Sequence, residues 1–278
     1  MAFKTLLSVT GPNMGDEDIK PAADLCNEIG AHLTVLAVVV AAPPPIGEYA
    51  AIASDDWSNE RQADTKLLQR RTASISAFIA GSALSADVSA AYLEAGWADE
   101  KIGRRARYAD LTIIGPELMV GGTLKNKVIE GVLFSSGKPL LLVPQGANPT
   151  LKPKRVLVAW DSRVEASNAV RDALDVLRAA DDVHLTLVDP IEGEMYHGEE
   201  PGADAAAYLA RHNVRVTVDR LPSSNHSVAD VLRSHSVDIG ADLMVMGAYG
   251  HSRLRERILG GVTKSMLEHP SIPILMAR

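Results

Sequence analysis

The two halves of this chain repeat one plan, and this repeat restricts the fold more than any other feature of its 278 residues. Ala109-Asp-Leu-Thr-Ile-Ile-Gly115 matches Ala241-Asp-Leu-Met-Val-Met-Gly247, and Lys138-Pro-Leu-Leu-Leu-Val143 matches Ile272-Pro-Ile-Leu-Met-Ala277. Each match lies at a similar place in its half. A repeat of about 140 residues is too long for a solenoid unit, so each copy is expected to be a domain.

Composition marks the boundary between the copies. Residues 145–154 are rich in Gly, Pro and polar side chains, and they lie between two apolar, strand-like runs, Leu140–Val143 and Arg155–Trp160. We therefore predict one domain over residues 1–146 and a second over residues 153–278.

Apolar runs alternate with helical patterns in both halves. Alternation at this spacing predicts right-handed crossovers and a mostly parallel sheet with helices on both faces. The predicted fold is α/β: two tandem, doubly wound, mostly parallel five-stranded sheets. Strands are expected near 4–9, 33–40, 86–91, 111–114 and 139–143, and again near 155–160, 183–188, 214–219, 242–246 and 273–277. Helices are expected from near Trp57 to residue 80, and near 164–179, 203–212, 226–237 and 261–268.

Charge and cysteine content exclude several classes of function. The formal net charge of −7 argues against nucleic acid or anionic membranes as partners. The single cysteine, Cys26, excludes an internal disulfide and a cysteine-based zinc site, and we expect it in the core. No apolar run approaches the ~18 residues of a membrane span, and the first residues read as a strand and not as a signal peptide. The default expectation is a cytoplasmic protein.

A glycine-rich segment follows the fourth predicted strand of the second half. Gly247 and Gly250 come directly after Leu243–Met246, and Gly260-Gly261-Val262-Thr263 opens the next helical pattern. Glycine lets a backbone approach an anion closely, and the N–H groups of a helix start bind that anion. The segment therefore predicts a phosphate-binding loop.

Asp161 and Asp189 follow the first and second strands of the second half, so both are expected at the same edge of the predicted sheet. Ligands of open parallel sheets bind beyond the carboxyl ends of the strands. An acid, backbone groups and an anion loop at one edge fit a nucleotide better than a metal alone. Asp161 has an alternative role as the N-cap of the helix expected near Val164, for which Ser162 competes.

With these motifs the chain resembles the universal stress protein family in its two-domain, tandem form. Nucleotide-binding members of that family carry Gly-x2-Gly-x9-Gly followed by Ser or Thr. This chain has Gly247, Gly250 and Gly260 at that spacing, and then Gly261 where a hydroxyl is usual. The resemblance implies a Rossmann-like fold of the adenine nucleotide alpha hydrolase type that binds ATP, ADP or AMP, with or without Mg²⁺. One missing hydrogen bond is worth about 1 kcal/mol, so binding is expected to be weakened or altered and not abolished.

The resemblance also implies which residues contact the nucleotide. Asp161 matches the family's aspartate after the first strand, and backbone groups at Val188 would face the adenine edge. No catalytic residue is assigned, because no nucleophile–base pair is visible around the loop. No metal ligand is assigned either, because the histidines lack zinc spacing. The full set implied for the nucleotide is Ala159, Asp161, Val188, Met246, Gly247, Gly250, His251, Gly260, Gly261, Val262 and Thr263.

The first half departs from this pattern. Leu118 stands three residues after Gly115 where the family has glycine, Thr10-Gly11-Pro12 replaces the first-strand aspartate, and Glu117 adds a negative charge. We therefore interpret the first half as a degenerate copy without the nucleotide site.

Three functions are compatible with this sequence. The first is a stress-response protein that binds an adenine nucleotide in its second domain, with a regulatory role and at most slow ATP hydrolysis. The second is an interaction scaffold that binds no nucleotide and whose sheets serve domain pairing and dimerisation. Family domains pair through their last strands, so the resemblance implies that the two halves pair in this way within one chain, with a homodimer as a further option. The third, an enzyme of the related hydrolase or ligase group, ranks last because Trp160-Asp-Ser-Arg163 lacks that group's glycines.

Overall fold

The structure is a computed structural model that describes residues 3–45, 50–191, 193, 200–249 and 261–278. Internal contacts divide the described chain into two compact units, Phe3–Gly137 and Lys138–Arg278. We call them the N-terminal unit and the C-terminal unit and describe each by itself.

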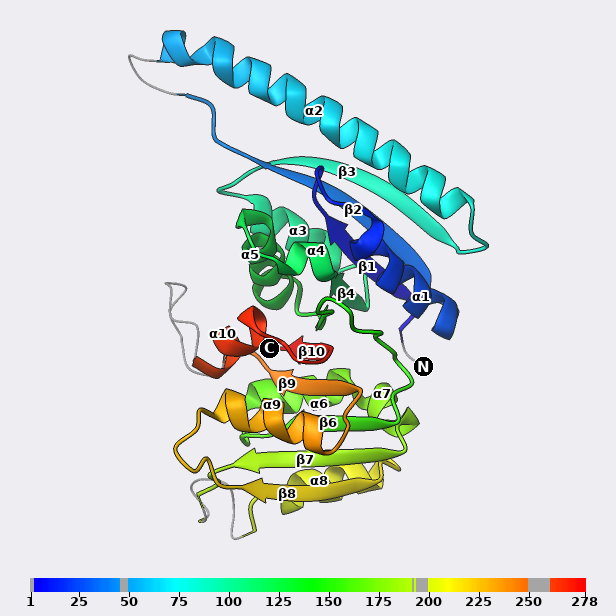
Figure 1. The fold of residues 1–278 in the computed structure, drawn as a ribbon, viewed down its shortest axis with the longest axis vertical. Coiled ribbons are helices and arrows are strands. Elements are labelled where there is room, and N and C mark those ends of the chain that lie inside the picture. The colour runs from blue at the N-terminus through cyan, green and yellow to red at the C-terminus, as the bar shows by residue number, and fades with distance from the viewer. Residues whose placement is uncertain (1–2, 46–49, 192, 194–199, 250–260) are drawn as a thin grey trace. The chain divides into compact units, whose positions relative to one another are not determined.

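The N-terminal unit alternates strands with helices along the chain (Figure 1). Its elements are β1 (Thr5–Thr10), α1 (Ile19–Ile29), β2 (His32–Ala41), α2 (Ala50–Ala80), β3 (Ala86–Glu94), α3 (Ala98–Ala106), β4 (Leu111–Ile114), α4 (Pro116–Met119) and α5 (Thr123–Glu130). A 3-10 turn at Asp16–Asp18 precedes α1, and a π-helical segment at Gly131–Ser136 follows α5. The strands pair in parallel in the order β3-β2-β1-β4.

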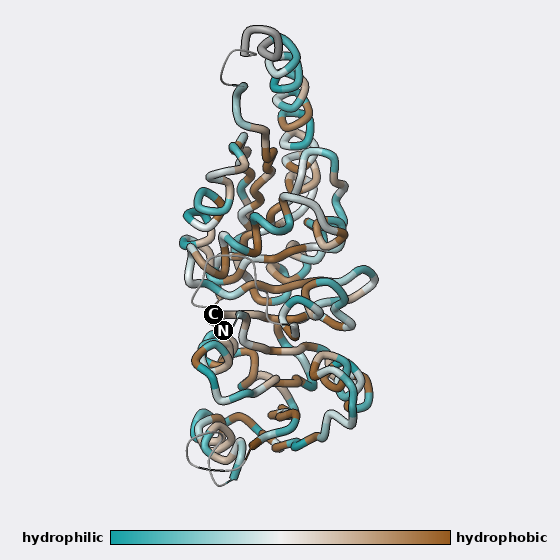
Figure 2. Tube along the Cα trace, turned by 90° about the vertical axis from the view of Figure 1, so that its left-hand side faces the viewer, coloured by the Kyte–Doolittle hydropathy of each residue, from teal (hydrophilic) through white to brown (hydrophobic). Residues whose placement is uncertain are grey.

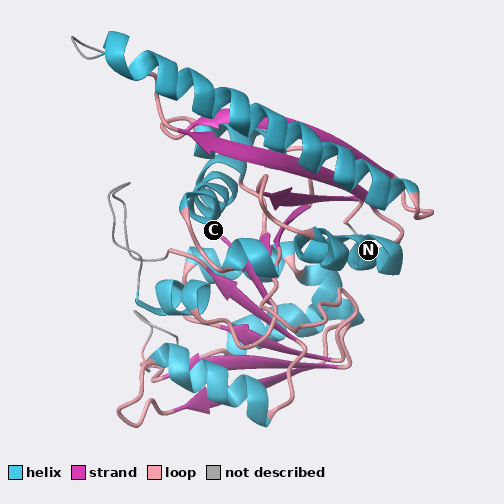
Figure 3. Cartoon of the chain, turned by 45° about the horizontal axis from the view of Figure 1, so that its top comes forward, coloured by secondary structure: helices cyan, strands magenta, loops and turns pink. Residues whose placement is uncertain are grey.

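The C-terminal unit repeats this alternation. Its elements are β5 (Leu140–Leu142), β6 (Arg155–Ala159), α6 (Val164–Asp172), α7 (Leu174–Ala179), β7 (Asp182–Val188), α8 (Ala203–Arg211), β8 (Val216–Leu221), α9 (Val228–Asp238), β9 (Leu243–Gly247), α10 (Gly261–Glu268) and β10 (Ile274–Ala277). The strand order is β5-β10-β9-β6-β7-β8, and every described pair is parallel except β5 with β10. Helices cover both faces of these strands (Figure 1 and Figure 3).

The predicted α/β fold with a mostly parallel sheet is confirmed, and the predicted strands and helices lie within a few residues of the observed ones. Three details differ. The helix expected over 164–179 is interrupted at Ala173, and the long helix begins at Ala50 and not near Trp57. The strand expected to close the first half is β5, which pairs antiparallel with β10, so the units hold four and six strands in place of five each.

The duplication extends to individual hydrogen bonds. Asp110 Oδ2 accepts the backbone N–H groups of Lys4 and Thr5, at 2.7 and 3.0 Å. Asp242 Oδ2 accepts the matching pair at the start of β6, at the same two distances. The repeated Ala-Asp dipeptide therefore fixes the same contact between the first and fourth strands of each copy.

The core is aliphatic and follows the strands, which are drawn mostly in brown in Figure 2. All residues of β4 and β10 are buried. Cys26 is fully buried in α1, as expected, and burial raises the pKa of its thiol to about 12. None of the described helices combines the length and the apolar character that crossing a bilayer needs.

Candidate functional site

The strand order of the C-terminal unit reverses between β6 and β9. β6 pairs with β7 on one side and with β9 on the other, so the chain first winds outward through β7 and β8 and then returns to β9. The loops after β6 and β9 consequently diverge to opposite faces of the sheet. In open parallel sheets this divergence leaves a crevice at the carboxyl ends of the strands.

A cavity of about 540 Å³ occupies this position. Its volume lies within the range of about 300–1,000 Å³ that is typical of small-molecule sites. Its described lining residues come from β6 and the loop after it, from β7 and β9, and from the N-terminal parts of α6, α9 and α10. They are Ala159, Trp160, Asp161, Arg163, Glu165, Ala166, Thr186, Val188, Ser227, Val228, Ala229, Leu232, Met246, Gly247, Gly261, Val262, Thr263 and Ser265.

Most residues named from the sequence meet at this cavity. Three predicted residues, Gly250, His251 and Gly260, lie outside the described residues. Asp189 is not among the described lining residues. Its Oδ1 accepts the backbone N–H of Ser223 at 2.9 Å. Hydrogen bonds from Ser223, first from its side chain and then from its backbone, lower the pKa of Asp189. The predicted residues that line the cavity are Ala159, Asp161, Val188, Met246, Gly247, Gly261, Val262 and Thr263.

Asp161 begins the loop that leaves β6. Its Oδ1 accepts the backbone N–H of Arg163 at 3.1 Å, and its Oδ2 lies 3.7 Å from Arg163 Nε. The N-cap of α6 is Arg163, so neither Asp161 nor Ser162 takes the capping role that we considered. The Asp161 side chain is 55% exposed and can accept further hydrogen bonds from a ligand.

Gly247 and Gly261 differ in the space that surrounds them. A Cβ on Gly247 would lie 2.5 Å from the backbone N of Ala166 and 2.6 Å from the carbonyl carbon of Glu165. Gly247 therefore permits the close packing of α6 against β9. A Cβ on Gly261 would meet no described atom within 4 Å, so that position has room for a side chain.

Thr263 links the two ends of the loop. Its side chain is buried, and its Oγ1 accepts the backbone N–H of Tyr249 at 3.3 Å. Tyr249 has a φ of 66°, in the left-handed region that non-glycine residues rarely occupy. The Thr263 hydroxyl thus fixes how the chain leaves β9 and can still donate its own proton.

The N-terminus of α9 contributes lining residues that the sequence did not predict. Ser227 caps this helix, because its Oγ accepts the backbone N–H of Asp230 at 3.1 Å and donates to Asp230 Oδ2 at 2.7 Å. The Ser227 hydroxyl is the main cause of a lowered pKa of Asp230, followed by Arg233. Ser-x-x-Asp before an apolar run is a readable helix start. Its place beside β7 depends on the crossover after β8, which no local pattern reports.

The N-terminal unit fills the corresponding position with its own residues. Between β1 and β4, the Glu117 carboxylate accepts the backbone N–H of Gly15 at 2.6 Å. A Cβ on Gly115 would overlap the Cα of Asp18. Thr10 Oγ1 also donates to Asp18 Oδ2 at 3.4 Å. That the first half binds no nucleotide stays a prediction.

Part of this chain is similar to a known protein family. The model of the universal stress protein family matches residues 152–278. The universal stress protein Slr1230 of Synechocystis sp. is 27% identical over 151 residues, which cover 54% of this chain and only 50% of that protein, so the match spans about half of the relative's length.

Solved structures resemble the chain over its whole length. A universal stress protein from Archaeoglobus fulgidus has a TM-score of 0.62 at 16% identity, covering 100% of this chain and 99% of that one. A putative universal stress protein from Pseudomonas aeruginosa has a TM-score of 0.54 at 14% identity, covering 99% and 93%. At these identities the likeness shows the fold of the chain and not its ligand.

Proposed function

We propose that this chain, whose residues 152–278 belong to the universal stress protein family, is a stress-response protein that binds ATP or a related adenine nucleotide in its C-terminal unit. It acts by binding and not by rapid turnover. The observation that carries the proposal is the cavity of about 540 Å³ at the switch in strand order between β6 and β9.

The lining of the cavity supports each part of such a ligand. Val188, Leu232 and Met246 contribute an apolar wall that suits a flat base. The exposed carboxylate of Asp161 can accept hydrogen bonds from ribose hydroxyls. Gly261–Thr263 form the first turn of α10, where backbone N–H groups have no partner within the helix and favour an anion.

The same donor set is compatible with Mg²⁺. Mg²⁺ binds mainly through substrate phosphates and water, with one or two protein carboxylates. Among the described residues, the carboxylates that line the cavity are those of Asp161 and Glu165. Bound there, Mg²⁺ would neutralise phosphate charge, while Arg163 adds a fixed positive charge on the same wall.

The described lining favours retention of the nucleotide over its consumption. It holds hydroxyls and carboxylates, but no histidine or lysine that could serve as a base near neutral pH among the described residues. Positioning and electrostatics alone support slow phosphoryl transfer, so slow hydrolysis is a property to measure beside binding.

Isothermal titration of the full chain with Mg²⁺ and ATP tests the proposal. Asp161→Ala should weaken binding at least tenfold, because it removes a ligand-facing carboxylate from the cavity. Asp189→Ala is the matched control. Asp189 also follows the end of a strand and also accepts one backbone N–H, but it does not line the cavity. Its affinity should equal that of the wild type.

Two results would overturn the proposal. Equal affinity of the wild type and Asp161→Ala would place the ligand elsewhere. Absence of any binding or thermal shift in millimolar ATP would favour the scaffold function instead.

A further inference from the structure

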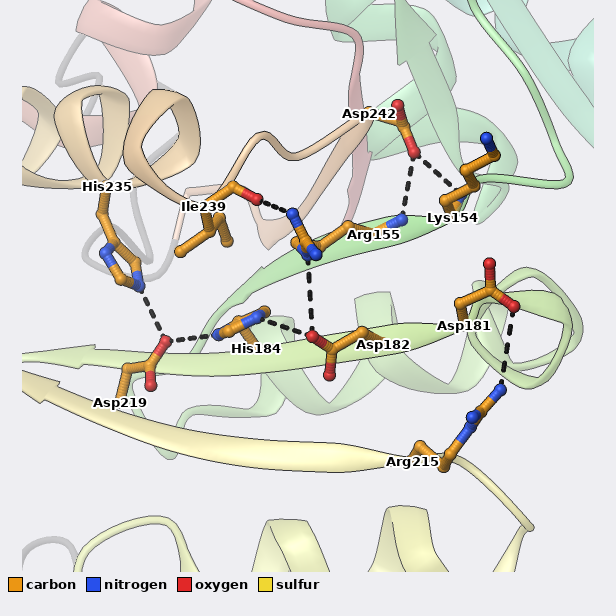
Figure 4. Close-up of polar contacts among 10 residues, drawn as sticks. All are labelled: Lys154, Arg155, Asp181, Asp182, His184, Arg215, Asp219, His235, Ile239 and Asp242. Carbon is orange, nitrogen blue, oxygen red and sulfur yellow. Dashed lines mark hydrogen bonds and ion pairs between the residues drawn. The ribbon is translucent and has the colours of Figure 1, made fainter.

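The geometry points to a metal site that the sequence did not predict: we propose that His184, Asp219 and His235 bind one divalent transition-metal ion, with Zn²⁺ as its representative. Figure 4 shows the two imidazoles converging on one carboxylate oxygen. Asp219 Oδ2 lies 2.8 Å from His184 Nδ1 and 2.7 Å from His235 Nε2. All three candidate ligand atoms lie within 4.8 Å of one another.

Three rigid elements hold these side chains together. His184 lies on β7 and Asp219 on β8, and the parallel register pairs His184 with Thr217 and Thr186 with Asp219, so both side chains lie on one face of the sheet. His235 lies on α9, which packs on β7. The three side chains are 16–18% exposed, which fixes their positions and leaves an entry for an ion and for water.

The two neutral imidazoles of the cluster have too few N–H donors for their contacts with carboxylate oxygens. His184 Nε2 lies 3.1 Å from Asp182 Oδ2, while its Nδ1 faces Asp219. Together with His235 there are three contacts between ring nitrogens and carboxylate oxygens, yet two neutral imidazoles carry only one N–H each. One contact then sets a nitrogen lone pair against an anionic oxygen.

A divalent ion resolves this conflict. With the His184 proton on Nε2, facing Asp182, the lone pairs of His184 Nδ1 and His235 Nε2 are both available to a metal at Asp219 Oδ2. The competing arrangement places a third proton on the cluster, as an imidazolium, and needs no metal. The two arrangements differ in a measurable way, because only one of them takes up Zn²⁺.

The outer partner of the site is also present. Metal-bound histidines almost always donate their second ring N–H to a carboxylate or carbonyl, which fixes the tautomer and the ring orientation. Asp182 provides that acceptor for His184. Arg155 Nε lies 3.6 Å from the same Asp182 oxygen, and Arg155 also donates to the carbonyl of Ile239. Asp182 is therefore oriented from two sides.

Two imidazole nitrogens and one carboxylate oxygen select the class of ion. This donor set suits Zn²⁺, Co²⁺, Ni²⁺ or Cu²⁺ and is poor for Mg²⁺ or Ca²⁺, which prefer oxygen. At bond lengths of about 2.0–2.1 Å, tetrahedral ligands stand about 3.3 Å apart. The contacts of Asp219 Oδ2 with the two ring nitrogens, at 2.8 and 2.7 Å, are about half an ångström shorter than this, so the side chains need to shift when an ion binds. Water can complete the coordination.

The N-terminal unit provides an internal comparison. His32-Leu-Thr34 on β2 repeats His184-Leu-Thr186 on β7, and His32 Nε2 lies 2.7 Å from Asp87 Oδ1. The other ring nitrogen of His32 faces the Ser85 hydroxyl at 2.8 Å, and a hydroxyl can either donate or accept. One neutral imidazole satisfies both contacts, so this copy needs no metal.

The proposed metal site is distinct from the nucleotide cavity. His184, Asp219 and His235 are not among its lining residues, although Thr186 and Leu232, on the same strand and helix, are. The inference consequently does not depend on nucleotide binding, and each can fail without the other.

Zinc titration of the chelator-treated full chain tests the site, with bound metal counted by elemental analysis after dialysis. The wild type should retain one Zn²⁺ per chain, and Co²⁺ in its place should give a visible d–d absorption band. His235→Gln and Asp219→Asn should weaken Zn²⁺ binding at least 100-fold and abolish the Co²⁺ band. His32→Gln, at the matching contact of the N-terminal unit, should bind Zn²⁺ as the wild type does.

A variant of Asp182, which contacts His184 and not the ion, keeps the test decisive if a ligand variant fails to fold. Asp182 is 40% exposed, and Asp182→Asn should fold while binding Zn²⁺ about 10–100-fold more weakly. The proposal is overturned if the wild type takes up no Zn²⁺, or if folded His235→Gln or Asp182→Asn binds it as tightly as the wild type.

Discussion

The carboxylate of Asp18 accepts a hydrogen bond from the backbone N–H of Glu117 at 2.8 Å. The N–H of Leu118 donates to the same oxygen at 3.0 Å. These donors directly follow β4, at the place that corresponds in the C-terminal unit to the glycine loop after β9. The N-terminal copy therefore satisfies its own anion-binding backbone with a side chain, which explains physically why a nucleotide is not expected there.

This arrangement predicts a pH-dependent stability. Asp18 is fully buried, and burial raises its pKa from 3.8 to about 6, against the opposing effect of its backbone hydrogen bonds. Because the folded pKa lies above the unfolded one, the contribution is complete below pH 3.8 and is lost as pH rises through 6. Between these limits the free energy of unfolding should fall by up to about 3 kcal/mol.

Urea unfolding of wild type and Asp18→Asn across pH 4–7 measures this contribution. Asparagine keeps an acceptor for the two N–H groups and removes the buried charge. The free energy of unfolding of Asp18→Asn relative to wild type should therefore increase with pH. Asp24→Asn removes an exposed charge from α1 and should change stability by less than about 0.5 kcal/mol at each pH. A pH-independent difference for Asp18→Asn would refute the explanation.

Local sequence patterns predict most of the fold. The features that they do not predict depend on packing between residues far apart in the sequence. Alternating apolar runs placed the strands because buried parallel strands are continuously apolar. The glycine spacing and Asp161 predicted the position of the cavity because strand ends meet at one edge, although fewer than half of its described lining residues were named from the sequence. His184 and His235 meet although they are far apart in sequence, on a strand and a helix, so no spacing rule could join them. The pairing of β5 with β10 likewise depends on assembly of the sheet.

Gly247→Ala should destabilise the C-terminal unit. Its Cβ would lie 2.5 Å from the backbone of Ala166, and backbone at the start of α6 cannot move aside as a flexible side chain can. Overpacking of this kind typically costs about 1–3 kcal/mol. Thermal unfolding followed by circular dichroism measures the loss. An unchanged melting temperature would show that α6 is not held against β9 in the way described.

Gly261→Ser should strengthen nucleotide binding. The position is exposed and open among the described residues, and serine restores the hydroxyl that is usual at this point of the family motif. One hydrogen bond of about 1 kcal/mol corresponds to roughly a fivefold lower Kd for ATP in isothermal titration. Gly261→Ala adds the Cβ without the hydroxyl and should leave Kd unchanged. An equal gain in both variants would exclude the hydrogen bond as the cause.

Two substitutions of Ser227 should separate the stability of α9 from the electrostatics of the cavity. Ser227→Ala removes the cap on the Asp230 N–H and should cost about 1 kcal/mol of unfolding free energy. Ser227→Asp keeps a capping oxygen, because aspartate is as good an N-cap as serine. It also places a negative charge on the cavity wall, opposite a polyanionic ligand. The new carboxylate also lies against Asp230 Oδ2, to which the Ser227 hydroxyl donates at 2.7 Å, so the stability should fall by about as much as in Ser227→Ala. The ATP affinity of Ser227→Asp should fall several-fold, which Ser227→Ala should not reproduce. The fall should be smaller at high ionic strength, where the charge is screened.

Titrations at low and high salt, paired with thermal unfolding, measure both effects. If Ser227→Asp binds ATP as tightly as the wild type at low salt, the phosphates of the nucleotide do not approach the start of α9.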